Sequence, residues 1–380
     1  MSLQQITIVT EHEARARHVL REDWVACGEA FLDCRIPGSN RKLNYALVGM
    51  GVAQNADQII NIQGKHGFDL GAASMPHGVI NNLHLHFSAE VFMCFRGEWA
   101  VRWGNDGKDG EITIREDDIV SIPTWIFRGF TNIGPDDSFI FTALGQDNSG
   151  GILWAPSVID AAARTGLHLT RENLLFDSLP AGGVVPADVQ LIAPMSADEM
   201  AGLRRYTPEQ MGRRLVRPQD LQWSATALLD CRLPGGGAEL APVVGYGMTQ
   251  DRNHEPPVGN PHSLSIEWLR SAPGAGMSRH RLVCSEVLVV KEGDWELVLN
   301  EGDAEVRLAL APWEVVSVPV NTWRSLRNVG GSPGRIVVML GGDARKVIDW
   351  HPAVVQAALA QNLRLDASGY VAPAHLLPVT

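Results

Sequence analysis

Cysteine is scarce in this 380-residue chain, whose five cysteines are odd in number and include no close pair. Such usage fits reduced thiols in a cytosol better than a disulfide framework. Long apolar runs are also missing, since none approaches the roughly 20 residues that a membrane helix needs. The amino-terminal segment mixes charges through its apolar positions and lacks a signal-peptide core. We therefore expect a cytoplasmic protein that does not enter membranes.

Basic residues are also fewer than acidic residues. The formal net charge is −11, which argues against a nucleic-acid partner because such proteins present basic faces. Hydrophobic residues make up 45% of the chain and charged residues 20%, as in ordinary globular proteins. The length allows two domains, each with a full core. A small-molecule ligand is the expected partner.

The chain repeats itself at an offset of 196 residues, as from His84 to His280. So many positions match in this register that chance is excluded, and they include Gly49/Gly245, His66/His262, Gly78/Gly274, Glu90/Glu286, Gly97/Gly293, Trp99/Trp295, Pro123/Pro319, Arg128/Arg324, Asn132/Asn328 and Trp154/Trp350. One extra residue shifts the earlier Leu-Asp-Cys-Arg stretches, at 32–35 and 229–232, to an offset of 197. The chain is a tandem duplication.

Each repeat is predicted to consist of short strands. Residues 91–95, 99–103, 111–115 and 119–122 are rich in β-branched and aromatic residues, with an Asn-Asp-Gly turn at 105–107. The second copy repeats the pattern at 287–290, 295–299 and 315–318. Short strands joined by tight turns predict an antiparallel barrel or sandwich.

Helices are predicted only outside these strands. Short helices are expected at 156–165 and 352–361, and two further helix starts at Ser196 and Thr207, where a glutamate or glutamine follows three residues later. We place an amino-terminal barrel at 1–175, a linker of loops and helices at 176–204, and a carboxyl-terminal barrel at 205–380.

One group of side chains has the spacing of a metal site. On a strand, His84 and His86 project from the same face, and Glu90 follows just past a turn. Two imidazoles and one carboxylate suit Fe, Mn, Ni or Zn as divalent ions. In the second copy Leu282 replaces the second histidine, so the amino-terminal barrel is the candidate for a metal, and we expect none in the carboxyl-terminal barrel.

The arrangement resembles the cupin superfamily. The first cupin signature, G-x5-H-x-H-x3-E-x6-G, fits residues 78–97 at every fixed position. The second, G-x5-P-x-G-x2-H-x3-N, fits only at the proline and the asparagine. Its two glycines are replaced by Asp117 and Trp125 in one copy and by Trp313 and Asn321 in the other, and its histidine by Arg128 and Arg324.

Because the resemblance covers both halves, it implies a bicupin. The expected fold class is all-β, with two tandem cupin-type antiparallel β-barrels (jelly rolls) and short accessory helices. The resemblance also implies two halves packed as a pseudo-dimer, and a homodimer of the chain as in some bicupins.

The two arginines leave two functional hypotheses open. In one, His84, His86 and Glu90 bind a metal for dioxygenase-type catalysis, in which Glu90 and Arg128 take part. Arg128 then grips the carboxylate of an acidic substrate, and Trp125 lines the pocket beside it. In the other, Glu90–Arg128 and Glu286–Arg324 ion pairs replace the metal, and a metal-free cupin binds, senses, sequesters or isomerises an acidic metabolite, with Arg128 and Arg324 as the anchors.

Overall fold

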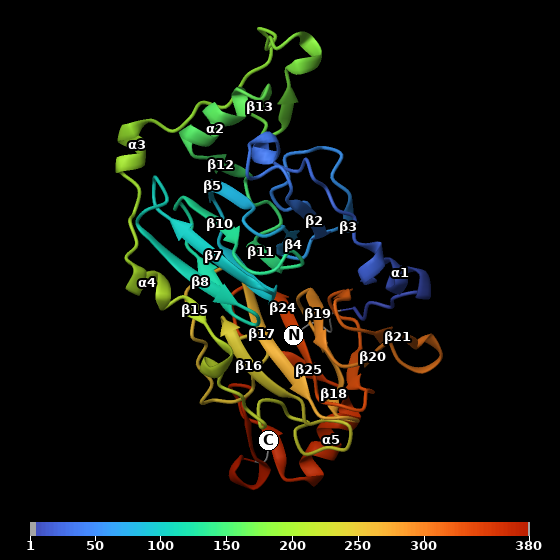
Figure 1. The fold of residues 1–380 in the computed structure, drawn as a ribbon. Helices are drawn as coiled ribbons and strands as arrows, with labels where there is room; N and C mark the ends of the chain where they lie inside the picture. Colours follow the sequence, from blue (N-terminus) through green and yellow to red (C-terminus); the bar gives the residue numbers. More distant parts are fainter. Residues whose placement is uncertain (1–4, 379–380) are drawn as a thin grey trace. The chain divides into compact units, whose positions relative to one another are not determined.

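The computed structural model describes residues 5–378, and the chain forms two compact units built mainly from β-strands (Figure 1). One unit spans Trp24–Gln219. The other combines the described residues up to Asp23 with those from Asp220 onward. The predicted all-β class is confirmed. The two units are defined by contacts between residues in space. The domain boundaries expected at 175 and 204 follow the sequence repeat instead, and they stay a prediction.

The unit Trp24–Gln219 contains a seven-stranded and a five-stranded sheet. The larger sheet has, in spatial order, β15 (Leu215–Val216), β9 (Ile119–Ile122), β6 (Glu90–Arg96), β11 (Phe139–Gly145), β4 (Phe68–Ser74), β2 (Leu43–Val48) and β3 (Ile60–Ile62). The smaller has β12 (Ile152–Trp154), β5 (Ile80–His86), β10 (Arg128–Asn132), β7 (Glu98–Trp103) and β8 (Gly110–Arg115). All pairs are antiparallel except β2 with β3.

The other unit repeats this arrangement. Its six-stranded sheet has β1 (His18–Val19), β22 (Val315–Val318), β19 (Glu286–Glu292), β24 (Gly334–Gly341), β17 (Leu264–Ser271) and β16 (Glu239–Val244). Its five-stranded sheet has β21 (Val306–Leu310), β20 (Trp295–Leu299), β23 (Arg324–Asn328), β18 (Gly276–Leu282) and β25 (Ile348–Trp350). The repeat extends to the register of the strands. The pairing of β10 with β5 is irregular between Arg128 and Phe130, and the equivalent pairing of β23 with β18 is irregular between Met277 and His280.

The helices lie outside the barrels, as predicted. The two expected after the strands are α2 (Pro156–Ala163) and α5 (Pro352–Ala360), each followed by a two-stranded sheet: β13 (Leu167–Leu169) with β14 (Leu175–Asp177), and β26 (Leu363–Leu365) with β27 (Val371–Pro373). The capping boxes at Ser196 and Thr207 begin α3 (Ala197–Ala201) and α4 (Pro208–Gly212). A further capping box at Thr10, which the sequence analysis did not identify, begins α1 (Glu11–Ala16).

The first strand of each repeat pairs within the unit of the other repeat. β1 pairs with β22, and its counterpart β15 pairs with β9. In the same way Val9 exchanges two backbone hydrogen bonds with the side chain of Asn300, at 2.9 and 2.7 Å. This exchange explains why residues before Trp24 belong to the carboxyl-terminal unit.

The backbone is left-handed, the conformation that favours glycine, at the four positions where the second cupin signature has glycine. Asp117, Trp125, Trp313 and Asn321 all have positive φ, between 55 and 75°. A left-handed conformation costs a non-glycine residue roughly 1–2 kcal/mol. The partial fit of the signature therefore reflects substituted side chains on a retained backbone.

No helix within residues 5–378 is long and apolar enough to cross a membrane.

Candidate metal centre and its cavity

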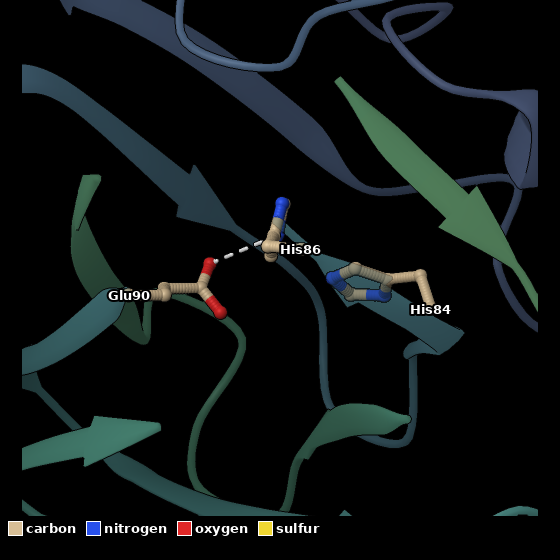
Figure 2. Close-up of side chains that lie close together, drawn as sticks. All are labelled: His84, His86 and Glu90. Carbon is tan, nitrogen blue, oxygen red and sulfur yellow. Dashed lines mark ion pairs between the residues drawn. The ribbon is translucent and has the colours of Figure 1, made fainter. Parts of the chain in front are cut away.

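The two predicted histidines and the glutamate come together inside the Trp24–Gln219 unit. His84 and His86 project from the end of β5, and Glu90 begins β6. All three are buried, and one nitrogen or oxygen of each lies within 4.8 Å of the other two (Figure 2). Among residues 5–378 no other group of three or more His, Cys, Asp or Glu side chains has this geometry.

His84 is present in the neutral form that binds metals. Nδ1 of His84 lies 2.7 Å from the carbonyl oxygen of Asn82, which can only accept, so Nδ1 carries the proton and Nε2 has a free lone pair. Burial, and then the charge of Arg128, hold the pKa of His84 well below its usual range. Nε2 of His86 lies 3.4 Å from Oε1 of Glu90, and its Nδ1 has no hydrogen-bond partner within the described part of the chain.

Arg128 forms an ion pair with Glu90, and both of its hydrogen bonds to this carboxylate reach the same oxygen. Nε and Nη2 donate to Oε2 at 3.0 and 2.8 Å, while Nη1 donates to the Ile126 carbonyl at 3.3 Å. Burial alone would raise the pKa of the Glu90 carboxyl and lower that of the guanidinium. The two hydrogen bonds oppose this, because they are strongest between charged partners, so we assign the pair as ionised.

A cavity of about 60 Å³, the space open to the centres of water molecules, lies against the three ligand candidates. Its walls are mainly apolar and aromatic, with polar groups gathered near the histidines; they include Tyr45, Met50, Phe130, Leu144, Ile152 and Trp154, together with Lys42, Asn44 and Asn81. At about 10–15 Å³ per water, this space suits a compact ligand with few heavy atoms.

Lys42 is the cation in the cavity wall. It is 4% exposed, and its Nζ donates to Asp33 Oδ1 and, at 2.6 Å, to Asn81 Oδ1. The ammonium also lies 5.0 and 5.5 Å from the ring centroids of Phe31 and Trp154. Burial lowers the pKa of Lys42, and the Asp33 carboxylate acts in the opposite direction.

The equivalent position of the other unit is packed with apolar side chains. Arg324 donates from Nε to Oε2 of Glu286 at 3.0 Å, so the ion pair recurs. His280 is buried, and burial followed by the Arg324 charge lowers its pKa to about 3. Leu282, however, belongs to the apolar core of this unit. One histidine and one carboxylate do not make a metal site of the predicted kind.

The remaining predicted site residues lie elsewhere. Arg128 is fully buried behind Glu90 and does not line the cavity. Trp125 is 48% exposed and packs on Phe87, with ring centroids 5.2 Å apart, also outside the cavity wall. Arg324 pairs with its own glutamate in the other unit. Direct contact of these three residues with a substrate stays a prediction, and the geometry does not favour it.

Sequence reasoning missed Lys42 and Asn81. No motif marks them, because a lysine before a strand and an asparagine on one are common. The internal repeat did contain the signal: the equivalent residues are Ala238 and Met277, so they change to apolar residues together with the change from His86 to Leu282.

Comparison with known proteins defines the fold. No family model matches the chain, and no curated protein matches it. Among solved structures, the formate complex of the Lactobacillus farciminis oxalate decarboxylase is 11% identical, with a TM-score of 0.51 over 87% of this chain and 88% of that one. A mutant of the Bacillus subtilis oxalate decarboxylase is 12% identical, with a TM-score of 0.52 over 91% and 81%.

A further structure of the Bacillus subtilis enzyme, studied for its Mn(II) centres, is 12% identical, with a TM-score of 0.50 over 91% of this chain and 81% of that one. At such identities the similarity establishes the fold. Both units have the cupin fold, and the chain is a bicupin in architecture, as the signatures predicted.

Proposed function

We propose that this bicupin is a metal-dependent enzyme whose amino-terminal barrel binds one divalent transition metal and transforms a small organic anion. The observation that supports it is the convergence of the buried side chains His84, His86 and Glu90 at one cavity. Two imidazoles and one carboxylate leave open positions on an ion, an arrangement typical of non-heme oxygenases. We infer a dioxygenase-type reaction on this ground.

The donor set fits a metal even though Arg128 is present. Both hydrogen bonds from Arg128 to Glu90 reach Oε2, so Arg128 does not engage Oε1, which faces Nε2 of His86 at 3.4 Å. Arg128 thus orients the carboxylate and stabilises its charged form, which is the form that ligates. The ion pair and the metal, alternatives when only the sequence was considered, are compatible here.

Charge balance favours an anionic ligand. Lys42 and Asp33 form one ion pair beside the cavity and Arg128 and Glu90 another, so these four charges sum to zero. A divalent ion at the triad would leave an uncompensated double positive charge in a buried space. Burying such a charge is costly without a counter-charge. A carboxylate or dicarboxylate supplies it.

When bound, a divalent ion would act as a Lewis acid that orients and polarises the ligand's oxygens. The chain's own groups prepare the site. The Asn82 carbonyl fixes the His84 tautomer, and Arg128 fixes Glu90. Phe130, Leu144 and Trp154 give the cavity apolar walls, which strengthen electrostatic interactions beside them.

A second candidate is a metal-free cupin in which the arginine takes the place of the ion. The recurrence of the pair as Glu286–Arg324, beside Leu282, favours this reading for the carboxyl-terminal barrel. Applied to the amino-terminal barrel, it predicts a binding or isomerase function without redox chemistry.

Metal-replete protein separates the two. On the first proposal, protein loaded with Fe(II) or Mn(II) binds small carboxylates and consumes dioxygen or releases a product with at least one of them, and His86→Leu abolishes both. On the second, neither the metal content nor the binding of carboxylates depends on His86. The Arg128→His variant adds a diagnostic: if the arginine replaces the ion, restoring the imidazole creates metal binding that the wild type lacks.

A further inference from the structure

We propose that Lys42 is an anion anchor, which holds a second carboxylate of the ligand while its other end lies at the triad. The inference rests on the proposed function and specifies its substrate class as a compact acid with two anionic groups. It depends on the donors of Lys42, on its place in the cavity, and on what the other unit has at the same positions.

One N–H group of the Lys42 ammonium has no hydrogen-bond acceptor in the described chain. An ammonium carries three N–H groups, and residues 5–378 supply two acceptors, Asp33 Oδ1 and Asn81 Oδ1. The side chain is buried and lines the cavity. A buried charged donor with an open position favours a ligand acceptor, because leaving a buried hydrogen bond unmade is costly.

The position of Lys42 suits a ligand that spans two sites. Asn81 accepts from Lys42 through Oδ1, and its Nδ2 lies 3.4 Å from Nδ1 of His84 as a contact between two donors, so one side chain neighbours both the ammonium and the triad. The charge of Lys42 also contributes to lowering the pKa of His84. Two positive centres at one small cavity are complementary to a short dicarboxylate or a hydroxy acid.

The simpler explanation is that Lys42 only neutralises Asp33. The other unit argues against it. There Asp230, the equivalent of Asp33, is fully buried and accepts from the Ser278 backbone at 2.6 Å, as Asp33 does from Asn82 at 3.1 Å. Oδ1 of Asp230 has no hydrogen-bond partner in the described chain, and burial raises the pKa of this residue, so the neutral carboxyl is favoured where no lysine is present. Yet Ala238, the residue before β16, stands where Lys42 stands before β2. The fold therefore accommodates the aspartate without a lysine.

The lysine is instead absent together with the rest of the site. Ala238, Met277 and Leu282 replace Lys42, Asn81 and His86, and all three belong to the apolar core of their unit. A purely structural lysine would have no reason to change in step with a metal-ligand position. The joint replacement indicates that the three polar residues serve one ligand.

The test measures binding of oxalate, malonate and acetate to wild-type protein and to Lys42→Met, each prepared with and without Mn(II). Calorimetry gives the dissociation constants, and elemental analysis gives the metal content of every sample. Lys42→Met/Asp33→Asn is the matched control, because it removes the unpaired carboxylate while an amide oxygen still accepts from Asn82.

Both variants are expected to retain wild-type metal content and to lose at least about tenfold in dicarboxylate affinity, whereas acetate changes by less than about threefold. Unchanged dicarboxylate binding, equal losses for acetate and malonate, or no dicarboxylate binding by wild-type protein in either metal state would each overturn the anchor. If wild-type protein prepared with Mn(II) contains no metal, that result contradicts the proposed function. The role of Lys42 is still tested in that case, by comparing malonate binding to metal-free wild-type protein and to metal-free Lys42→Met.

Discussion

Arg128 and Glu90 are joined through a single carboxylate oxygen. Two guanidinium nitrogens donate to Oε2 at 3.0 and 2.8 Å, and Oε1 lies 3.4 Å from Nε2 of His86. A side-on pair that used both oxygens would compete with a metal for the carboxylate. This pair does not, so the arginine at the place of the third cupin histidine orients Glu90 and leaves the other carboxylate oxygen facing His86.

The pair should contribute strongly to stability. Arg128→Met leaves the Glu90 charge buried without its partner, and the free energy of unfolding of that unit is expected to fall by about 3–5 kcal/mol. Arg128→Met/Glu90→Gln removes both charges and should recover much of the loss. Denaturant titration monitors the change, and equal stability of Arg128→Met and wild type would show that the pair is not formed in solution.

A second metal site should be obtainable by one substitution. The carboxyl-terminal barrel retains His280, Glu286 and Arg324, and Leu282 occupies the missing ligand position. Leu282→His is expected to raise the metal content by about one equivalent per chain if an arginine beside the glutamate permits ligation. Leu282→Gln is the control, since it introduces a polar group without an imidazole. No increase for Leu282→His in folded protein would mean that the arginine excludes the ion.

Stability should depend on pH through Glu267. This residue is fully buried near Glu286, its Oε2 has no hydrogen-bond partner in the described chain, and burial raises its pKa to about 8. Between the usual glutamate pKa, about 4.3, and 8, the folded state binds more protons than the unfolded state. The free energy of unfolding therefore falls as the pH rises through this window, by at most about 5 kcal/mol.

Glu267→Gln provides the control, because its amide oxygen can still accept from the Met248 backbone, which donates to Glu267 at 2.9 Å. Its unfolding free energy should vary less between pH 5 and 8 than that of wild-type protein. Parallel pH profiles would show that Glu267 does not titrate as described.

Most of the fold was predictable from the sequence because each strand pattern occurs twice, once in each copy of the repeat. The strands at 91–95 and 99–103 and the helix starts at Ser196 and Thr207 follow from local patterns, and the structure has β6, β7, α3 and α4 there. The exchange of β1 and β15 was not predictable, since two-residue strands carry no periodicity and pair with residues far away in sequence.

The site was predictable to the extent that spacing encodes it. His84, His86 and Glu90 are close in sequence on two consecutive strands, which belong to different sheets, so a motif specifies their meeting. The orientation of Arg128 depends on the packing around Glu90, and the approach of Lys42 to Asn81 depends on a loop that returns to β5. Such contacts arise from tertiary structure and leave no local pattern.

The amino-terminal segment should stabilise the carboxyl-terminal unit through Asn300. Its side chain bonds the backbone of Val9 and Ala304, and its φ is 62°. Asn300→Gly keeps the left-handed backbone accessible but removes these bonds, and should lower the unfolding free energy by about 1–3 kcal/mol. Asn300→Ala should lose roughly 1 kcal/mol more because of strain. Thermal unfolding of the two variants checks the order, and equal transitions for both would exclude the strain.

The most direct measurement is the metal content of wild-type protein purified from metal-replete culture, compared with that of His86→Leu. If Arg128 positions Glu90 and leaves Oε1 for a metal, wild-type protein carries about one equivalent of a divalent transition metal per chain and His86→Leu carries almost none. Less than about a tenth of an equivalent in folded wild-type protein would contradict the account and leave the ion pair as the replacement for the metal.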